Sequence, residues 1–331
     1  FRDMGFVANS DGTFKLYVAG GLGANHKMGV LVKEDVPAKD IFYYIKAMID
    51  LFCANGNYEN RAKARTRYLQ EKMGEEPRKE ELLRRAGELA AQGGHDCIVQ
   101  SDEPKKRGTK TIEGPRIIEQ KQEGLYAVEY HPIGGELPVD MPKKMLDALS
   151  RMDEVECRIG PDETMYFVNC TADEAQEFLD MTNDAASTPF EHSVACIGAS
   201  ICQQGLRNSQ AVLRDCIEEL KKHPQAAAVL PKVRISGCTS SCSAHQIGAI
   251  GFQGFVKVVD KVPQPAYRVF VGGSDKSDHV TFGDFVDVVL EKDMPALFVK
   301  LGEACAAAGK DWDSYAQDNR EEIVEIIKSF V

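Results

Sequence analysis

The spacing of apolar and polar residues predicts short buried strands and amphipathic helices along the chain. A strand is expected at residues 13–19 (TFKLYVA), where β-branched and aromatic residues run into a Gly-Gly-Leu-Gly turn. Apolar residues spaced three and four apart predict a helix over residues 37–54, closed by Gly56. Two further helices are expected, at residues 59–73 and 80–92.

A second pattern begins after residues 95–123, a charged stretch poor in large apolar residues that we interpret as a linker. The elements that follow are a strand, a helix, two strands joined by a turn, and a helix, at residues 125–130, 139–152, 155–159, 165–170 and from Thr171. Thr171 and Glu174 fit the capping box of a helix start. This βαββα order predicts a ferredoxin-like module over residues 124–188.

The last segment, residues 189–331, repeats part of the first. It contains a strand at residues 266–271, a Gly-Gly pair, a loop and then helices. The matching stretches are residues 17–21 with 270–273, and residues 54–58 with 308–312. Strand–Gly-Gly–helix also recurs by chance, but two matches at one offset of about 250 residues favour a duplicated unit. A counterpart of the module would then lie about 130 residues before Phe1, so we interpret the chain as lacking the front of its first copy.

Composition excludes several classes of protein. With 43% hydrophobic and 27% charged residues, the chain is neither disordered nor fibrous. No apolar run is long enough to span a membrane, and a net charge of −11 argues against a nucleic-acid partner. The chain opens with no secretory signal. We therefore expect a cytoplasmic globular protein without nucleic-acid or membrane partners.

Four of the ten cysteines are clustered and suggest a metal site. They form a C-x5-C pair and a C-x3-C pair, namely Cys196, Cys202, Cys238 and Cys242. Structural zinc sites normally use closer spacing on both sides, whereas four thiolates suit a 4Fe-4S cluster. Small residues around the second pair, such as Gly237, let backbone N–H groups approach sulfur. Four buried structural cysteines are the alternative, because free cysteine is often buried.

These residues resemble the cluster signature of the sirohaem- and 4Fe-4S-dependent sulfite and nitrite reductases. The stretches that carry the resemblance are ACIGASIC from Ala195, RISGCTSSCSAHQ from Arg234, GAIGFQG from Gly248, DMGFVA from Asp3, VAGGLG from Val18 and NRAKARTRY from Asn60. The resemblance covers essentially the whole chain. It implies a duplicated α+β architecture with mixed and antiparallel sheets, flanking helices and the ferredoxin-like module. Residues 1–94 would then be the rest of a first sirohaem-type domain, and residues 189–331 the second, cluster-bearing domain.

The resemblance also implies the cofactors and the reaction. All four clustered cysteines would bind a 4Fe-4S cluster, and Cys242 would bridge the cluster to the iron of a sirohaem. The implied reaction is the six-electron reduction of sulfite to sulfide or of nitrite to ammonia, with electrons from a ferredoxin or a flavoprotein. The sirohaem contacts that we predict in addition to Cys242 are Ser240, Lys27, His26, Arg61 and Arg65.

The sequence departs from the family pattern at two places. Thr239 and Ser240 stand where the family often has Pro and Asn, and Glu163 stands where it often has Gln. A carboxylate there would repel the acidic macrocycle, which is consistent with a structural role for the second copy. We predict no catalytic residue, because the basic stretch that the family uses is expected before Phe1. The chain alone is therefore expected to be inactive without the missing N-terminal half of the protein.

Two other classes remain possible on the sequence alone. One is a non-catalytic iron–sulfur protein for electron transfer or sensing that kept the cysteines and lost the haem pocket. The other is a structural fragment without a cofactor. The Gly-Gly-Leu-Gly turn does not add a nucleotide-binding class, because His26 occupies the last position of the G-x-G-x-x-G template.

Overall fold

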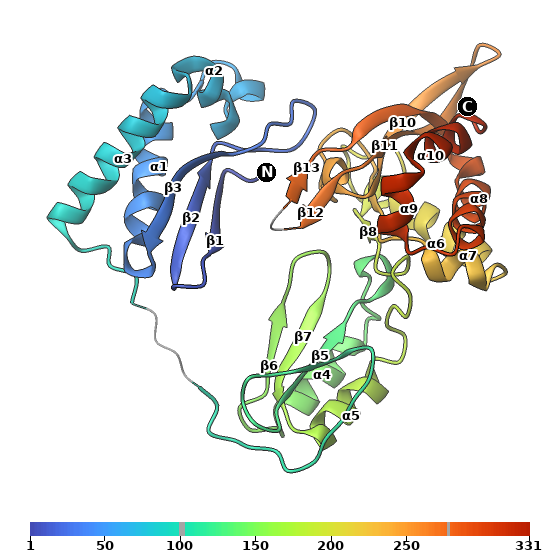
Figure 1. Cartoon of the computed structure of the whole chain (residues 1–331), viewed down its shortest axis with the longest axis horizontal. Coiled ribbons are helices and arrows are strands. Elements are labelled where there is room, and N and C mark those ends of the chain that lie inside the picture. Colours follow the sequence, from blue (N-terminus) through green and yellow to red (C-terminus); the bar gives the residue numbers. More distant parts are fainter. Residues whose placement is uncertain (99–102, 277–278) are drawn as a thin grey trace. The chain divides into compact units, whose positions relative to one another are not determined.

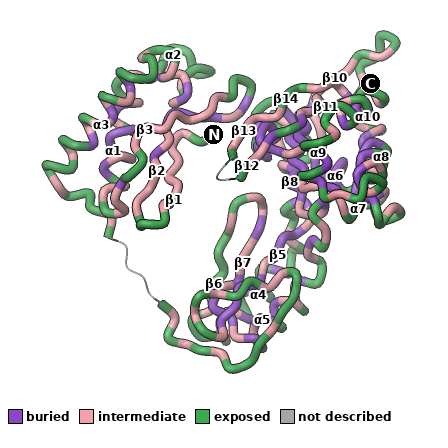
Figure 2. Tube along the Cα trace, in the orientation of Figure 1, coloured by how far each residue is buried: buried purple, intermediate pink, exposed green. Residues whose placement is uncertain are grey.

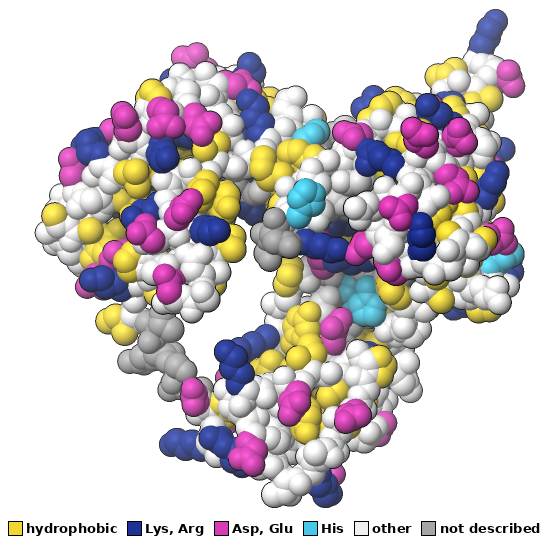
Figure 3. All heavy atoms as spheres, in the orientation of Figure 1, with side chains coloured by type: hydrophobic (Ala, Val, Ile, Leu, Met, Phe, Trp, Pro, Cys, Tyr) yellow, Lys and Arg dark blue, Asp and Glu magenta, His cyan; other side chains and the backbone are white. Residues whose placement is uncertain are grey.

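The structure is a computed structural model that describes residues 1–98, 103–276 and 279–331. The chain divides into two compact units, residues 1–102 and 103–331, each of which is described by itself. Within each unit the buried positions gather between sheet and helices (Figure 2). On the visible face, acidic and basic side chains are interspersed (Figure 3). Across the described ranges, no helix combines the length and the apolar character that a membrane span requires.

The first unit is a three-stranded antiparallel sheet with helices on one side (Figure 1). Its main elements are β1 Met4–Ala8, β2 Thr13–Val18, β3 Val30–Pro37, α1 Ile41–Asn55, α2 Leu69–Met73 and α3 Glu75–Gln92. Leu16 and Val18, two residues apart on β2, share a core with Ala47 and Leu51, four apart on α1. The strand and the first helix predicted from the sequence are confirmed.

The prediction of a helix over residues 59–73 is wrong for residues 59–68, because α2 begins only at Leu69. Two 3-10 turns, Arg61–Lys63 and Thr66–Tyr68, precede α2. Arg65 between them is extended, with φ −141° and ψ 150°, and the Asn60 side chain caps the first turn. Cations occupy every second position of this run, so no apolar stripe is left to bury a helix against the core.

The second unit begins with a small antiparallel sheet. Its elements are β4 Ile117–Glu119, β5 Tyr126–Tyr130, α4 Met141–Leu149, β6 Glu156–Ile159, β7 Met165–Cys170 and α5 Ala172–Met181, with strand order β4-β5-β7-β6. Phe167 of β7 stacks on Phe178 of α5 with ring centroids 4.0 Å apart. The predicted capping box at Thr171 and Glu174 is confirmed. Strand β4, in the stretch interpreted as a linker, supplies the sheet edge beside β5.

The rest of the second unit is a five-stranded mixed sheet covered by helices, together with a separate two-stranded sheet (Figure 1). Its elements are β8 Val194–Ala195, α6 Ser209–Leu220, α7 Pro224–Val229, β9 Arg234–Ser236, β10 Ile250–Val259, β11 Val262–Val271, β12 Ser274–Lys276, β13 His279–Thr281, β14 Asp284–Leu290, α8 Met294–Ala307, α9 Trp312–Asp318 and α10 Arg320–Lys328. The strand order is β14-β11-β10-β9-β8, parallel from β8 to β10 and antiparallel beyond. Strand β14 lies where the sequence predicted only a loop and helices.

The duplicated α+β architecture predicted from the sequence is confirmed. Strands β1, β2 and β3, a 3-10 turn and α1 recur as β10, β11 and β14, a 3-10 turn and α8. Gly5 of β1 and Gly251 of β10 each pair with an aromatic residue of the central strand. Ala19 and Gly272, directly after the central strands, are both left-handed, with φ 60° and 87°. The structural register therefore matches Ala19 with Gly272, one residue away from the match that the glycines suggested.

Candidate iron–sulfur site

Two of the four clustered cysteines leave neighbouring parallel strands at the same edge of the sheet. β8 and β9 pair in parallel, so their carboxyl ends lie side by side. Cys196 follows β8 and continues the ladder, donating its N–H to the Ile235 carbonyl at 3.1 Å. Cys238 follows β9 after Gly237. The sheet itself therefore brings the C-x5-C pair to the C-x3-C pair.

The other two cysteines are placed by tight turns. The Cys202 N–H donates to the Gly198 carbonyl at 2.9 Å, which closes the loop after Cys196. Around Cys242, Ser241 and Ala244 are left-handed, with φ 61° and 55°. The chain thereby reverses direction within a few residues of Cys242.

Backbone amides already point at two of the sulfurs. The Gly237 N–H donates to Cys196 Sγ at 3.2 Å, and the Ser240 N–H donates to Cys238 Sγ at 3.4 Å. The Ser209 hydroxyl lies 3.2 Å from Cys196 Sγ. Hydrogen bonds to sulfur favour the thiolate, which is the form that binds metals.

The four thiols are near enough for their charges to interact. The pKa of the Cys242 thiol is raised, first by loss of hydration and then by the neighbouring Cys196, Cys238 and Cys202. Without a bound cation, four thiolates would repel one another, and a metal would reverse this effect. The site therefore needs positive charge to hold all four cysteines deprotonated.

No group of three or more His, Cys, Asp or Glu side chains in the described ranges is arranged to hold a single metal ion. A cubane makes a different demand, because its four irons are each held by a separate cysteine and the sulfurs do not converge on one point. The donor chemistry of the four cysteines and their placement on the sheet therefore decide whether they fit a cluster.

Glycines let the backbone segments around the cysteines pack without side chains between them. A Cβ on Gly254 would lie 2.2 Å from the Gly237 carbonyl oxygen, and one on Gly237 would lie 2.6 Å from the Arg207 carbonyl oxygen. The same Gly237 carbonyl accepts the N–H groups of Leu206 and Arg207 at 2.9 and 3.0 Å. The two cysteine loops are thus fastened to each other and to β10.

The site is closed on one side and open on the other. Cys238 is buried, Cys196 and Cys202 are half-buried, and Cys242 is exposed. Ser240 beside it is also exposed. His245, just after this loop, is buried, with its ring centroid 5.4 Å from that of Phe270. Any group that binds over the open side would meet Cys242 and Ser240 first.

The four predicted sirohaem contacts of the first unit lie in two segments. His26 and Lys27 follow the Gly-Gly turn, and Arg61 and Arg65 lie at the 3-10 turns before α2. His26 is exposed, and Lys27 forms an ion pair with Glu71 at 2.7 Å. Arg65 lies 3.3 Å from an Asp3 carboxylate oxygen, and Arg61 is exposed on the first 3-10 turn. Arg65 lines a shallow cavity of about 240 Å³, together with two further cations, Lys63 and Lys72.

Arg67 is a residue of this region that the sequence did not single out as a site. It is 9% exposed, and its Nη1 donates to the Leu22 carbonyl at 2.8 Å. This hydrogen bond stabilises the Gly-Gly-Leu-Gly turn. No local signal could have found Arg67, because it continues the same alternation of cations as the exposed Arg61 and Arg65.

Glu163, the predicted departure from the family pattern, lies inside the second unit. Its carboxyl packs beside Gly135. Burial raises the pKa of Glu163 to about 7, and the Ala195 backbone amide opposes the shift only in part. The side chain therefore reaches the start of the strand-end turn that carries Cys196.

Comparison with known proteins finds relatives of the chain. The family described as "Nitrite and sulphite reductase 4Fe-4S domain" matches residues 1–89. The ferredoxin–nitrite reductase of Arabidopsis thaliana is 25% identical over 294 residues, which are 84% of this chain and 48% of that protein. The sulfite reductase (ferredoxin) 1 of Mycolicibacterium paratuberculosis is 22% identical over 313 residues, with 84% of this chain and 52% of that protein covered. The chain spans about half the length of these curated relatives.

Among solved structures, the NirA protein of Mycobacterium tuberculosis has the same fold. The TM-score is 0.78 at 20% sequence identity, over 98% of this chain and 61% of that chain. The family match covers the first unit, whereas the four cysteines lie in the second. The strands and the helix of the first unit recur in the same order in the second unit, so the matched residues have a structural counterpart next to the cysteines.

Proposed function

We propose that this chain, a member of the sirohaem- and 4Fe-4S-dependent nitrite and sulphite reductase family, holds a 4Fe-4S cluster on the four clustered cysteines. These ligands are Cys196, Cys202, Cys238 and Cys242. One observation carries the proposal: two adjacent parallel strands are followed directly by the loops that hold Cys196 and Cys238, and both sulfurs already accept backbone N–H bonds.

The residues present fit an iron–sulfur cluster. Thiolates are the ligands that hold such clusters, and hydrogen bonds to sulfur together with burial set their potential. The backbone donors of Gly237 and Ser240 supply the hydrogen bonds, and the buried Cys238 supplies a side shielded from water. The protein's part is therefore to fix four thiolates and to restrict the access of water.

We further propose that the open side of the site faces a sirohaem. Cys242 is the most exposed of the four ligands, and the neighbouring Ser240 is exposed as well, so both can meet a large planar cofactor. Guanidinium and ammonium groups suit its carboxylates. The contacts proposed in the first unit are Lys27, His26, Arg61 and Arg65.

The reaction that we propose is the six-electron reduction of nitrite to ammonia or of sulfite to sulfide. When bound, the sirohaem supplies the iron that takes the substrate anion, and the cluster supplies the electrons. Relatives named as ferredoxin-dependent enzymes support a ferredoxin as donor, and a flavoprotein is the other candidate. We assign no proton donor in this chain and expect no turnover from the chain by itself.

Anaerobic reconstitution with iron and sulfide tests the ligand set. Wild type is expected to gain a broad visible absorption, and single serine variants of the four ligands are expected to lose most of it, since each substitution removes the only protein ligand of one iron. Cys53 and Cys157 are exposed cysteines outside the site. Their serine variants are matched controls and should reconstitute like wild type. Equal iron in Cys238→Ser and Cys157→Ser would refute the proposed ligands.

Addition of sirohaem separates the reductase from a bare iron–sulfur protein. Sharp bands on top of the broad cluster absorption, weakened in Cys242→Ser, are expected if the open side takes the macrocycle. Cluster absorption that does not change with sirohaem would instead favour an electron-transfer or sensing protein. Absence of both chromophores would leave a structural fragment.

A further inference from the structure

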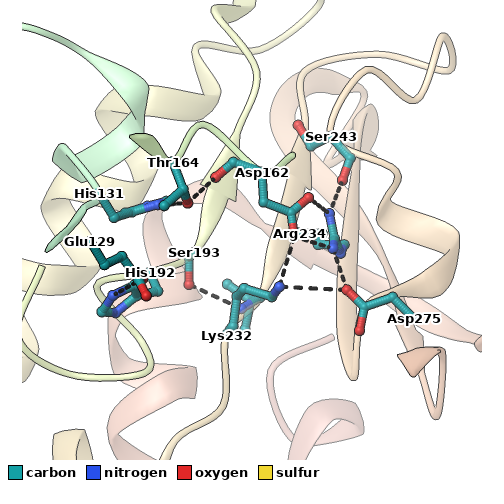
Figure 4. A network of polar contacts seen from close by, with 11 residues as sticks. Glu129, His131, Asp162, Thr164, His192, Ser193, Lys232, Arg234, Ser243 and Asp275 are labelled. Atoms are coloured by element: carbon teal, nitrogen blue, oxygen red, sulfur yellow. Dashed lines mark hydrogen bonds and ion pairs between the residues drawn. The ribbon is translucent and has the colours of Figure 1, made fainter. Parts of the chain in front are cut away.

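A buried arginine next to the cysteine loop joins three parts of the second unit (Figure 4). Arg234, the first residue of β9, is only 4% exposed. Its Nη1 donates to Asp162 Oδ1 at 2.8 Å and its Nη2 to Asp162 Oδ2 at 2.6 Å. The same Nη2 also forms an ion pair with Asp275. A planar guanidinium matches this two-carboxylate arrangement in a way that an ammonium does not.

The partners of Arg234 come from distant positions in the chain. Asp162 lies in the turn between β6 and β7 of the ferredoxin-like module, and Asp275 lies on β12. Lys232 adds a second cation, with its Nζ 2.8 Å from Asp162 and 3.5 Å from Asp275. The two carboxylates are thus held beside each other by two cations, and removal of the arginine would leave them largely uncompensated.

The module's turn is held in an uncommon backbone conformation where it meets Arg234. Asp162 and Glu163 are consecutive left-handed residues, with φ 62° and 64°, and neither is glycine. Such a conformation persists where the surroundings impose it. The turn joins two antiparallel strands, where positive φ is common, and the ion pairs of Asp162 with Arg234 and Lys232 hold it against β9.

Arg234 also reaches the loop that carries the last two cysteines. Its Nη1 donates to the Ser243 carbonyl at 3.2 Å, directly after Cys242. The Ser243 hydroxyl in turn donates to the Ile235 carbonyl at 2.7 Å, on the strand that Arg234 begins. The loop from Cys238 to Ser243 is therefore tied back at its far end to the strand from which it starts.

We propose that Arg234 is a positioning residue for the iron–sulfur cluster, holding Cys238 and Cys242 in binding geometry through the Ser243 carbonyl while Asp162 and Asp275 hold the arginine. The inference rests on the proposed function for the presence of the cluster. It adds that the ferredoxin-like module acts on the cluster site through Asp162. Outer partners of metal ligands commonly control affinity in this way.

The test compares the Arg234→Lys and Asp162→Asn variants with wild type in two measurements. The first is amide hydrogen exchange over residues 236–247 in the metal-free chain. The second is the rate at which a ferrous chelator removes iron from the reconstituted chain. Both variants are expected to exchange faster in this segment and to lose iron about tenfold faster, as outer-partner mutations commonly do.

Arg214→Met is the matched control. Arg214 of α6 forms an ion pair with Glu136, so it too links the C-terminal domain to the module region, but it is 48% exposed and does not touch the cysteine loop. The control should resemble wild type in both measurements. Urea unfolding of wild type and all variants measures their overall stability. A general loss of stability would lower the free energy of unfolding and raise exchange throughout the second unit, not only over residues 236–247.

The outcomes separate this inference from the proposed function. Wild type without a cluster would overturn the proposed function and with it the role assigned to Arg234. Wild type with a cluster, but with unchanged iron loss and unchanged loop exchange in Arg234→Lys, would overturn the present inference alone. Faster loss in Arg234→Lys and Asp162→Asn, with Arg214→Met like wild type, would support it.

Discussion

The two copies of the internal repeat share one scaffold, but among the described residues the cysteine site adjoins the second copy only. In the first copy, β1 forms the edge of its sheet among the described residues. In the second copy, the corresponding β10 pairs with β9, and the sheet continues to β8. All four cysteines lie in loops that follow these two added strands. In the described residues, the site therefore depends on the two strands beside β10 and not on the strands and helix that the two copies share.

A pair of corresponding glycines shows how the added loops constrain the second copy. A Cβ on Gly251 would lie 1.9 Å from the His245 carbonyl oxygen, whereas a Cβ on Gly5 would meet nothing closer than the Tyr17 Cβ at 4.0 Å. The cysteine loop packs directly on β10 at Gly251, and nothing equivalent covers Gly5 in the described residues. The same position is thus free in one copy and fully occupied in the other.

The largest expected effect follows from this pair. Gly251→Ala should destabilise the second unit by about 3 kcal/mol, because backbone must move to admit the methyl group. It should also reduce cluster uptake, since His245 follows the cysteine loop. Urea unfolding and iron content after reconstitution measure the two effects.

Gly5→Ala is the matched substitution in the first copy. Its effect should lie within about 0.5 kcal/mol of zero, as for most substitutions without a packing conflict. Equal destabilisation by the two substitutions would contradict the view that, in the part of the chain that the structure describes, loops pack on this strand in the second copy alone.

A second prediction concerns the Gly-Gly turn of the first copy. Arg67→Met removes the charged hydrogen bond to the Leu22 carbonyl and leaves that half-buried acceptor without it, at an expected cost of about 2 kcal/mol. Arg65→Met is the control, because its ion pair with Asp3 is more than half exposed on the arginine side and should contribute under about 1 kcal/mol. Hydrogen exchange of residues 21–27 reports the difference, and equal exchange in both variants would exclude a supporting role for Arg67.

The smallest prediction is a pH effect confined to the second unit. Burial raises the pKa of Glu163 to about 7, above the value of about 4.3 expected in the unfolded chain. The neutral acid therefore stabilises the fold at low pH, and this contribution is lost as pH rises through 7. Glu163→Gln should gain stability relative to wild type between pH 5 and pH 8, by on the order of 1 kcal/mol.

His131 acts in the opposite direction and has to be separated from Glu163. Burial lowers the pKa of His131 to about 4, so its contribution is lost on acidification below about 6.5. Both chains retain His131, and the difference between wild type and Glu163→Gln therefore isolates the carboxyl. A difference that does not vary with pH would show that Glu163 titrates as it does in water.

Local signals in the sequence predicted much of the fold. The strand at β2, the helix at α1 and the capping box at Thr171 each depend on residues close together in the chain, and all three are confirmed. The prediction of one helix over residues 59–73 was wrong because this segment, although rich in good helix formers, has no apolar face to bury. β14 was missed because its apolar run has charged residues at its start and middle.

The contacts between distant segments could not be predicted from the sequence. The four clustered cysteines were identified from spacing and resemblance, and their ligand roles stay a prediction. Arg234 was visible only as part of a motif, because its carboxylate partners lie 72 and 41 residues away. Which of the many acidic residues would face it depends on how the module's turn meets β9, and no local pattern encodes that meeting.

The most direct test of the central claim is the metal and sulfide content of the anaerobically reconstituted wild-type chain. We expect about four iron atoms and about four acid-labile sulfides per chain, because a 4Fe-4S cluster on four cysteines requires both. One zinc atom per chain without sulfide, or no bound metal at all, would contradict it.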